Sequence, residues 1–140
     1  MNLMSLNNVL EISVYPNNKY SVISKTFIKD YLKSYASGIS EEISNNIIFC
    51  SEELLTNIIE HNKSIKTYEL IKIKVMVIKN IVSLIFEAPD NNPVEYSGFE
   101  SENFKRNFKG AGFYLISKIS SNFTFYHKNG TNSFNIDFNF

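Results

Sequence analysis

Three polar side chains recur four residues apart in one segment of the chain: Glu53, Asn57 and His61. In an α-helix each step of four residues turns the chain by about 400°, so successive side chains drift by only about 40°. A carboxylate, an amide and an imidazole therefore project from one narrow face, as binding and catalytic groups do. A solvated polar face on an amphipathic helix gives the same pattern, and the spacing alone leaves both interpretations open.

A second feature is a pair of glycines, Gly110 and Gly112, directly before an apolar run that begins at Phe113. Glycine lets backbone N–H groups approach a phosphate closely, and the N-terminus of a helix presents the positive end of its dipole. The pair therefore indicates a phosphate-binding turn at the start of a helix. A plain junction between a loop and a helix would have the same composition.

The segment that contains Glu53 is the strongest predicted helix. Ser40 is its expected N-cap and residues 62–64 end it. An apolar stripe at helical spacing runs along it, formed by Ile43, Ile47, Cys50, Leu54 and Ile58. Another helix is predicted over residues 21–35 and ends at Ser37 and Gly38. Cys50 is the only cysteine, so an internal disulfide is impossible, and we expect a buried apolar residue there rather than a catalytic thiol.

Alternating apolar residues and two turn signals predict the strands. Lys79 and Asn80 form a predicted tight turn in which the asparagine takes the left-handed conformation, and Asn129 with Gly130 predicts a type I′ turn. A helix is also predicted over residues 113–119, after a polar loop over residues 88–109 whose length favours a functional role. The strands are expected at residues 9–15, 68–78, 81–86, 123–127 and 134–140.

This order of elements predicts one α+β domain over residues 1–140. We expect a two-layer α/β sandwich with a mixed, mostly antiparallel sheet and the helices on one face. The helix with Glu53 would lie over the sheet and form one wall of a ligand cleft. The last predicted strand alternates cleanly, which indicates a sheet with one buried face and one face in water.

Composition narrows the class of protein. Apolar residues make up 44% of the 140 residues and charged residues 20%, as in an ordinary soluble globular protein. Fourteen basic residues balance fourteen acidic ones, so we expect no nucleic acid and no anionic membrane as partner. No apolar run approaches the roughly 18 residues of a membrane span. Residues 1–5 have no basic segment before an apolar run, so we expect a cytoplasmic protein.

Three segments together resemble a known family. Residues 51–61 resemble the N-box of the small RsbW-like anti-sigma-factor serine kinases, members of the histidine-kinase-like ATPase superfamily. Residues 110–116 resemble the second glycine box of that family, and residues 129–134 resemble its closing hairpin. The order and spacing of the three segments agree with the predicted strands and helices. The resemblance implies a Bergerat-type ATP-binding fold.

The same resemblance implies roles for individual residues. Asn57 would hold the Mg²⁺ that bridges the ATP phosphates, and Glu53 would act as the base, or as the carboxylate that orients the attacking hydroxyl. His61, Gly110 and Gly112 would join Asn57 in binding the nucleotide. Three cations would lie in a lid over the nucleotide, although they could equally be ordinary solvated charges: Lys105, Arg106 and Lys109.

One motif of the family is altered. The first glycine box should read Asp-x-Gly, with the aspartate accepting a hydrogen bond from the adenine amino group. An alignment on Asn92 and Pro93 places Phe86 and Ala88 at the two positions, and a shift of one residue places Glu87 and Pro89 there. The glycine is absent in both alignments. Glu87 is the first candidate for the adenine contact, and Asp90 is the second.

Three functions follow from the resemblance. The first is a homodimeric partner-switching regulator that binds a sigma factor and uses ATP and Mg²⁺ to phosphorylate a serine on an anti-anti-sigma (STAS-type) antagonist. The second is a binding module that keeps the fold and the partner surface without nucleotide turnover. The third is a detached catalytic domain of a histidine kinase, which the absence of an upstream helix pair with a phospho-accepting histidine disfavours. The altered first glycine box is the feature that distinguishes the first two of these functions.

Overall fold

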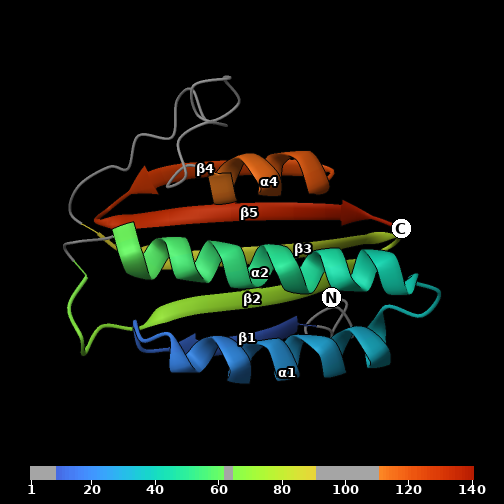
Figure 1. Ribbon diagram of the computed structural model, residues 1–140, viewed down its shortest axis with the longest axis horizontal. Helices are drawn as coiled ribbons and strands as arrows, with labels where there is room; N and C mark the ends of the chain where they lie inside the picture. Colours follow the sequence, from blue (N-terminus) through green and yellow to red (C-terminus); the bar gives the residue numbers. More distant parts are fainter. Residues whose placement is uncertain (1–8, 62–64, 91–110) are drawn as a thin grey trace, which may run out of the picture.

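Five strands form one sheet, and three helices lie on one of its faces in the described part of the chain (Figure 1). The structure is a computed structural model that describes residues 9–61, 65–90 and 111–140. The elements in chain order are β1 (Val9–Val14), α1 (Lys19–Tyr35), α2 (Glu41–His61), β2 (Ile71–Ile78), β3 (Ile81–Pro89), α4 (Ala111–Ile119), β4 (Asn122–Lys128) and β5 (Thr131–Asn139).

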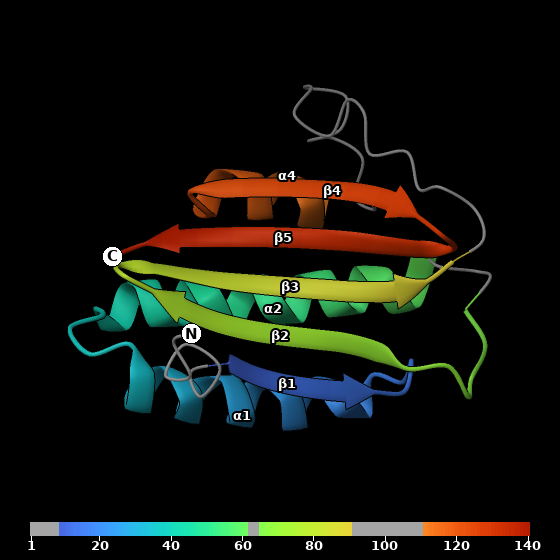
Figure 2. The same ribbon diagram turned by 180° about the vertical axis from the view of Figure 1, so that it is seen from behind.

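The strand order is β1-β2-β3-β5-β4, and all four neighbouring pairs are antiparallel. The predicted α+β class and the two layers are confirmed. The described strands contain no parallel pair, so the sheet is antiparallel throughout rather than mixed. Figure 2 shows the sheet from behind, where no described helix covers it.

Alternation along the strands decides which face is buried. On β3, four apolar side chains point toward the helices and are fully buried: Val82, Leu84, Phe86 and Ala88. Their neighbours in β2 and β5 on that face are buried too, and so are the facing residues of the helices, among them Ile28, Leu32, Ile47, Leu54, Ile58 and Ile116. Each of the larger side chains (valine, leucine, isoleucine, phenylalanine) contributes about 1.5–3 kcal/mol to folding, so this layer determines how the helices lie on the sheet.

The helix α2 begins as the sequence predicted, because the Ser40 Oγ accepts a hydrogen bond of 3.1 Å from the backbone N–H of Ile43. The helix α1 ends at its C-cap Ala36, and Gly38, with a φ of +88°, lies in the turn that follows, closed by a hydrogen bond of 3.1 Å from the Ile39 N–H to the Ala36 carbonyl. The helix α2 lies between α1 and α4 and contacts both (Figure 1). One flank of α2 therefore faces α1 and the other faces α4.

Some predicted strand boundaries were wrong, and in one correctly predicted turn the wrong residue was expected to have a positive φ. The strand expected from residue 68 begins at Ile71, because its partner strand β1 ends at Val14, which pairs with Ile71. The strand β3 extends to Pro89, because β5 pairs with it as far as Thr131. In the turn between β2 and β3 the positive φ of 56° belongs to Lys79 and not to Asn80. The type I′ prediction at Asn129 and Gly130 agrees with their φ values of 52° and 72°.

Candidate functional site

The helix α2 holds Glu53 and Asn57 on the flank that faces α4. The two residues are one helical turn apart, and the Asn57 Nδ2 donates a hydrogen bond of 2.8 Å to the backbone carbonyl of Glu53. This bond fixes the plane of the Asn57 amide. Asn57 is only 7% exposed, so a side chain that binding sites often use is buried in a helix interface. A buried amide needs hydrogen-bond partners, and the helix carbonyl supplies one of them.

Gly112, in the first turn of α4, packs directly against these two side chains. A Cβ atom at Gly112 would overlap the Asn57 Nδ2 and would lie 3.0 Å from the Glu53 Oε2. Since real Cβ atoms do not make contacts this close, a larger residue at position 112 would force the Asn57 amide, the Glu53 carboxyl or the start of α4 to shift. The glycine that the sequence singled out is therefore needed for close approach, and it brings the positive end of α4 to Glu53 and Asn57.

The Glu53 carboxyl is half-buried, and burial raises its pKa above the ordinary value for glutamate. The negative charges of Glu52 and Glu60 raise the pKa further. No lysine or arginine of the described ranges forms an ion pair with Glu53. A carboxylate in such a place holds a proton more readily than a solvated one, which suits a group that accepts a proton from a hydroxyl.

The structure brings together three of the residues that the sequence proposed for the site: Glu53, Asn57 and Gly112. His61 is the last residue of α2, and its side chain lies outside the described part of the chain. Gly110 lies outside the described residues, as do the three cations of the expected lid.

Glu87 does not join them. It lies on β3 between Phe86 and Ala88, both fully buried on the helix-facing side, so its side chain points to the opposite face of the sheet. There the Glu87 Oε1 lies 3.4 Å from the Lys74 Nζ. The strand alternation thus separates Glu87 from Glu53 by the full thickness of the sheet. Phe86 and Ala88, which one of the two alignments placed at the first glycine box, face the helices.

A polar cluster that the sequence did not assemble lies where β3 ends. Asp90 accepts a hydrogen bond of 3.2 Å at its Oδ2 from the Asn132 Nδ2, and the His127 Nε2 lies 2.7 Å from its backbone oxygen. The backbone N–H of Asp90 donates to the Gly130 carbonyl at 2.8 Å. The sequence named Asp90 as a second candidate for adenine, but it gave no signal for partners about forty residues away.

A cavity of about 390 Å³ between the end of α1 and the first turns of α2 lies away from these residues. Asn45 lines it, and Asn45 is twelve residues before Asn57, which is about 18 Å along the helix. This cavity is therefore separate from the site at Glu53 and Asn57.

The residues at the site suit a magnesium nucleotide in two respects. Asn57 offers a neutral oxygen beside a carboxylate, and magnesium favours a few such oxygen ligands together with water and phosphate. The described residues contain no cluster of three histidine, cysteine, aspartate or glutamate side chains that could hold a metal ion unaided. Water and phosphate oxygens would complete the coordination of a magnesium ion at Asn57, and the N-terminus of α4 at Gly112 lies beside Asn57.

Comparison with known proteins supports the fold. No protein-family model matches the chain, and no curated protein sequence matches it. Twelve chains of solved structures do match. One of them is the crystal structure of the RsbU and RsbW domains of Rv1364c from Mycobacterium tuberculosis, with a TM-score of 0.71 at 11% sequence identity. The match covers 94% of this chain and 32% of that chain. The chain therefore has an RsbW-like fold, as its motifs suggested.

No helix in the described ranges is long and apolar enough to cross a membrane.

Proposed function

We propose that the chain binds ATP with Mg²⁺ and phosphorylates a serine on an anti-anti-sigma protein, as part of a partner-switching regulator. The observation that carries this proposal is the contact between the start of α4 and the paired side chains of Glu53 and Asn57. It joins a carboxylate, an amide oxygen and a helix N-terminus, which are the groups that phosphoryl transfer uses for positioning and charge stabilisation. The RsbW-like fold agrees with the proposal.

Each residue has a distinct part in this proposal. Asn57 would contribute a ligand to Mg²⁺, which neutralises charge on the phosphates. The hydrogen bond from its Nδ2 to the Glu53 carbonyl occupies one end of the amide, so the other atom, Oδ1, is the one that would bind the metal. Glu53 would accept the proton of the serine hydroxyl, and its half-buried position favours that protonated form. Gly112 would allow the α4 backbone to approach the phosphates, as it approaches Asn57.

The partners in this proposal are a sigma factor, the STAS-type antagonist and a second copy of the chain in a homodimer. The alternative is a module that sequesters its partner without nucleotide turnover. The altered first glycine box favours the alternative, because Phe86 and Ala88 occupy the helix-facing positions of that box with buried apolar side chains. The Glu53 carboxyl, on α2, lies beside the first turn of α4. This favours the kinase, because a module without turnover would not need that carboxylate.

A binding measurement with and without Mg²⁺ tests the nucleotide site. ATP should bind more tightly with Mg²⁺, and Asn57→Ala should remove that gain because the amide ligand is lost. Asn45→Ala is the matched control: it is the same change on the same helix, at an exposed position about 18 Å away. Calorimetry gives both affinities. Equal affinity of the wild-type protein with and without Mg²⁺ would contradict the role of Asn57.

Phosphotransfer to an antagonist separates the kinase from the sequestering module. The wild-type chain, labelled ATP at millimolar concentration, Mg²⁺ and a STAS-type protein are mixed, and label on the antagonist is followed. The kinase proposal expects transfer. Partner binding without any transfer would support the module instead.

A further inference from the structure

The cavity between α1 and α2 has no part in the proposed ATP site. Its volume of about 390 Å³ is in the range of pockets that hold small molecules. It lies where the chain passes from α1 to α2, at the right of Figure 1, whereas the C-terminal end of α2 and the start of α4 lie at the left. A ligand of this cavity would therefore be a second ligand, and the residues of the walls indicate its chemistry.

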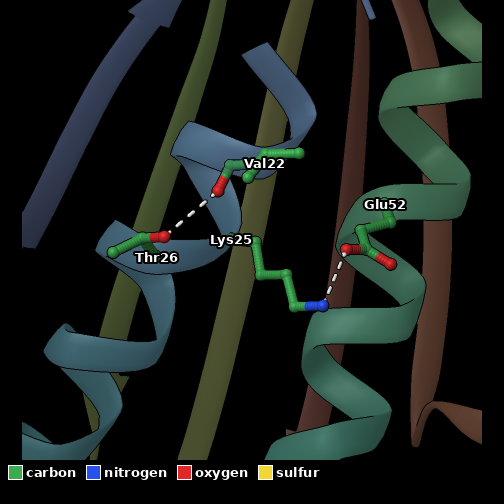
Figure 3. A network of polar contacts seen from close by, with 4 residues as sticks. All are labelled: Val22, Lys25, Thr26 and Glu52. Carbon is green, nitrogen blue, oxygen red and sulfur yellow. Dashed lines mark hydrogen bonds and ion pairs between the residues drawn. The ribbon is translucent and has the colours of Figure 1, made fainter. Parts of the chain in front are cut away.

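A row of lysines runs along the flank of α1 that faces α2. Lys25 forms an ion pair with Glu52 of α2 (Figure 3), and Lys29 and Lys33 follow at intervals of about one helical turn. Both of these later lysines are exposed and line the cavity. In the described ranges no ion pair joins either of them to a carboxylate. The α1 wall therefore presents two positive charges, which residues four apart on a helix can direct to the same anion.

The α2 wall offers a different set of groups. Ser44 and Asn45, about two turns before Glu52, lie where the next partner of the row of lysines would be, and both line the cavity. Glu41, the first residue of α2, lines it as well. The Glu41 carboxylate forms no ion pair with a lysine or arginine of the described part of the chain. Positive and negative charges therefore border one cavity without neutralising each other.

Hydrogen bonds fix both helix ends beside the cavity, so its walls are in place without a ligand. The Ser40 Oγ accepts from the Ile43 N–H at 3.1 Å, and the Ser40 carbonyl accepts from the Ser44 N–H at 3.0 Å. On the α1 side, the Ala36 N–H donates to the Leu32 carbonyl at 2.9 Å. A site that is already formed loses little conformational entropy when a ligand binds.

We infer that this cavity binds a free α-amino acid with an uncharged polar side chain. The carboxylate of the ligand faces Lys29 and Lys33, and its ammonium group faces Glu41. A simple anion would be repelled by Glu41 and a simple cation by the lysines, so a molecule with both charges fits the walls better than either. The inference goes beyond the proposed ATP site and does not depend on it.

The remaining groups of the walls determine which side chain fits. The Ser37 and Ser44 hydroxyls and the Asn45 amide can each donate and accept hydrogen bonds. Leu32 and Ala36, the buried apolar residues of the wall, are only 1% and 2% exposed, so a large apolar side chain would gain little by covering them. A neutral polar side chain, as in glutamine, asparagine or serine, matches these walls.

The test titrates the whole chain with L-glutamine, L-asparagine and L-serine, each alone, and follows the backbone amide signals by NMR. At least one of them should bind with a dissociation constant of about 1 mM or below, the upper end of ordinary Michaelis constants. The signals that move should come from residues 29–45. ATP with Mg²⁺ should not displace the amino acid, because the proposed ATP site lies about 18 Å away along α2.

Loss of either charge in the walls should weaken binding of the tightest of the three amino acids. Lys33→Gln and Glu41→Gln each remove one ion pair with the ligand, so each should raise the dissociation constant about 2- to 5-fold. Lys25→Gln is the matched control, because Lys25 lies on the same flank of α1 and is already paired with Glu52. Its dissociation constant should equal that of the wild-type protein. All three positions are exposed, so the fold should tolerate the changes.

The N-acetyl derivative of the same amino acid separates the two ends of the ligand. It keeps the carboxylate but has no ammonium group. Lys33→Gln should therefore still weaken its binding, whereas Glu41→Gln should no longer do so.

Each outcome decides the inference. Dissociation constants above about 1 mM for all three amino acids overturn it. It also fails if Lys25→Gln weakens binding as much as Lys33→Gln, since the overall charge of α1 would then be the cause. If Glu41→Gln weakens the amino acid and its N-acetyl derivative equally, the ammonium contact is wrong and the inference is overturned. A protein that binds an amino acid but no ATP would contradict the proposed function and leave this inference standing.

Discussion

Glu52 and Glu53 are neighbours in the sequence, yet they lie on opposite flanks of α2. The Glu52 Oε1 lies 3.4 Å from the Lys25 Nζ of α1 in an ion pair (Figure 3); the Lys25 side chain is 47% exposed and the Glu52 side chain 37%. Glu53 faces α4, has no ion pair within the described ranges, and lies at the Gly112 backbone. One step of about 100° around the helix changes a solvated ion pair into a half-buried carboxylate.

The two flanks of α2 differ in the kind of contact that they make with the neighbouring helix. On the α1 flank the polar contact is an exposed salt bridge, and such salt bridges add little to the stability of the fold. The α4 flank brings together a buried amide, a carboxylate with a raised pKa and a glycine whose replacement by a larger residue would force these side chains or α4 to shift. The proposed site rests on these features of the α4 flank.

Glutamine substitutions at the two positions give the largest expected difference. Glu53→Gln should lower the rate of phosphotransfer by about 100- to 10,000-fold, because the side chain can no longer accept a proton. Glu52→Gln should change the rate less than about threefold: the charge it removes raises the pKa of Glu53 less than burial does, and it is exposed and paired with Lys25. Single-turnover transfer from labelled ATP measures both rates.

Binding of the antagonist should be the same for both variants, which makes it the control for folding. If the two substitutions lowered the rate equally, the distinction between the flanks would be lost.

The next effect concerns two glycines. Gly112→Ala should lower the free energy of unfolding by about 1–3 kcal/mol, because the new methyl group forces α4 away from Asn57. Gly38→Ala has open space around its Cβ, so its expected loss of about 1–2 kcal/mol comes from the left-handed backbone alone. Urea unfolding gives both values.

Nucleotide binding separates the two causes. Only Gly112→Ala should also weaken the binding of ATP, because of the two glycines only Gly112 adjoins the proposed site. Weaker ATP binding by Gly38→Ala would mean that a general loss of stability, and not the geometry at Asn57, controls affinity.

Much of the fold could be predicted because local patterns determine it. Helical spacing located α2, Ser40 located its start, and Asn129 with Gly130 located the last hairpin turn. The strand ends could not be predicted, because each depends on where its partner ends, as Ile71 depends on Val14. The same limit applies to any feature that two distant segments form together.

The residues of the candidate site show the same difference between local and long-range features. Glu53 and Asn57 are four residues apart on one helix, so their proximity follows from helix geometry alone. Glu87 was the first choice for adenine because its type and position in the sequence suited the role, but alternation along β3 sends it to the other face. Asp90 and Asn132 meet only because β3 and β5 pair, and no sequence pattern reports that pairing.

The smallest expected effect belongs to the salt bridge between Lys25 and Glu52. A double-mutant cycle of Lys25→Ala and Glu52→Ala should give a coupling free energy of about 0.2–1 kcal/mol at low salt. Both side chains are more than one-third exposed, so water already solvates the two charges and ordering two long side chains offsets part of the attraction. At 1 M salt the Debye length falls to about 3 Å, so the coupling should nearly vanish.

Urea unfolding of the four proteins at both salt concentrations supplies the cycle. A coupling above about 2 kcal/mol that resists salt would mean that the α1 flank holds a desolvated ion pair, and the contrast with the α4 flank would then rest on Asn57 and Gly112 alone.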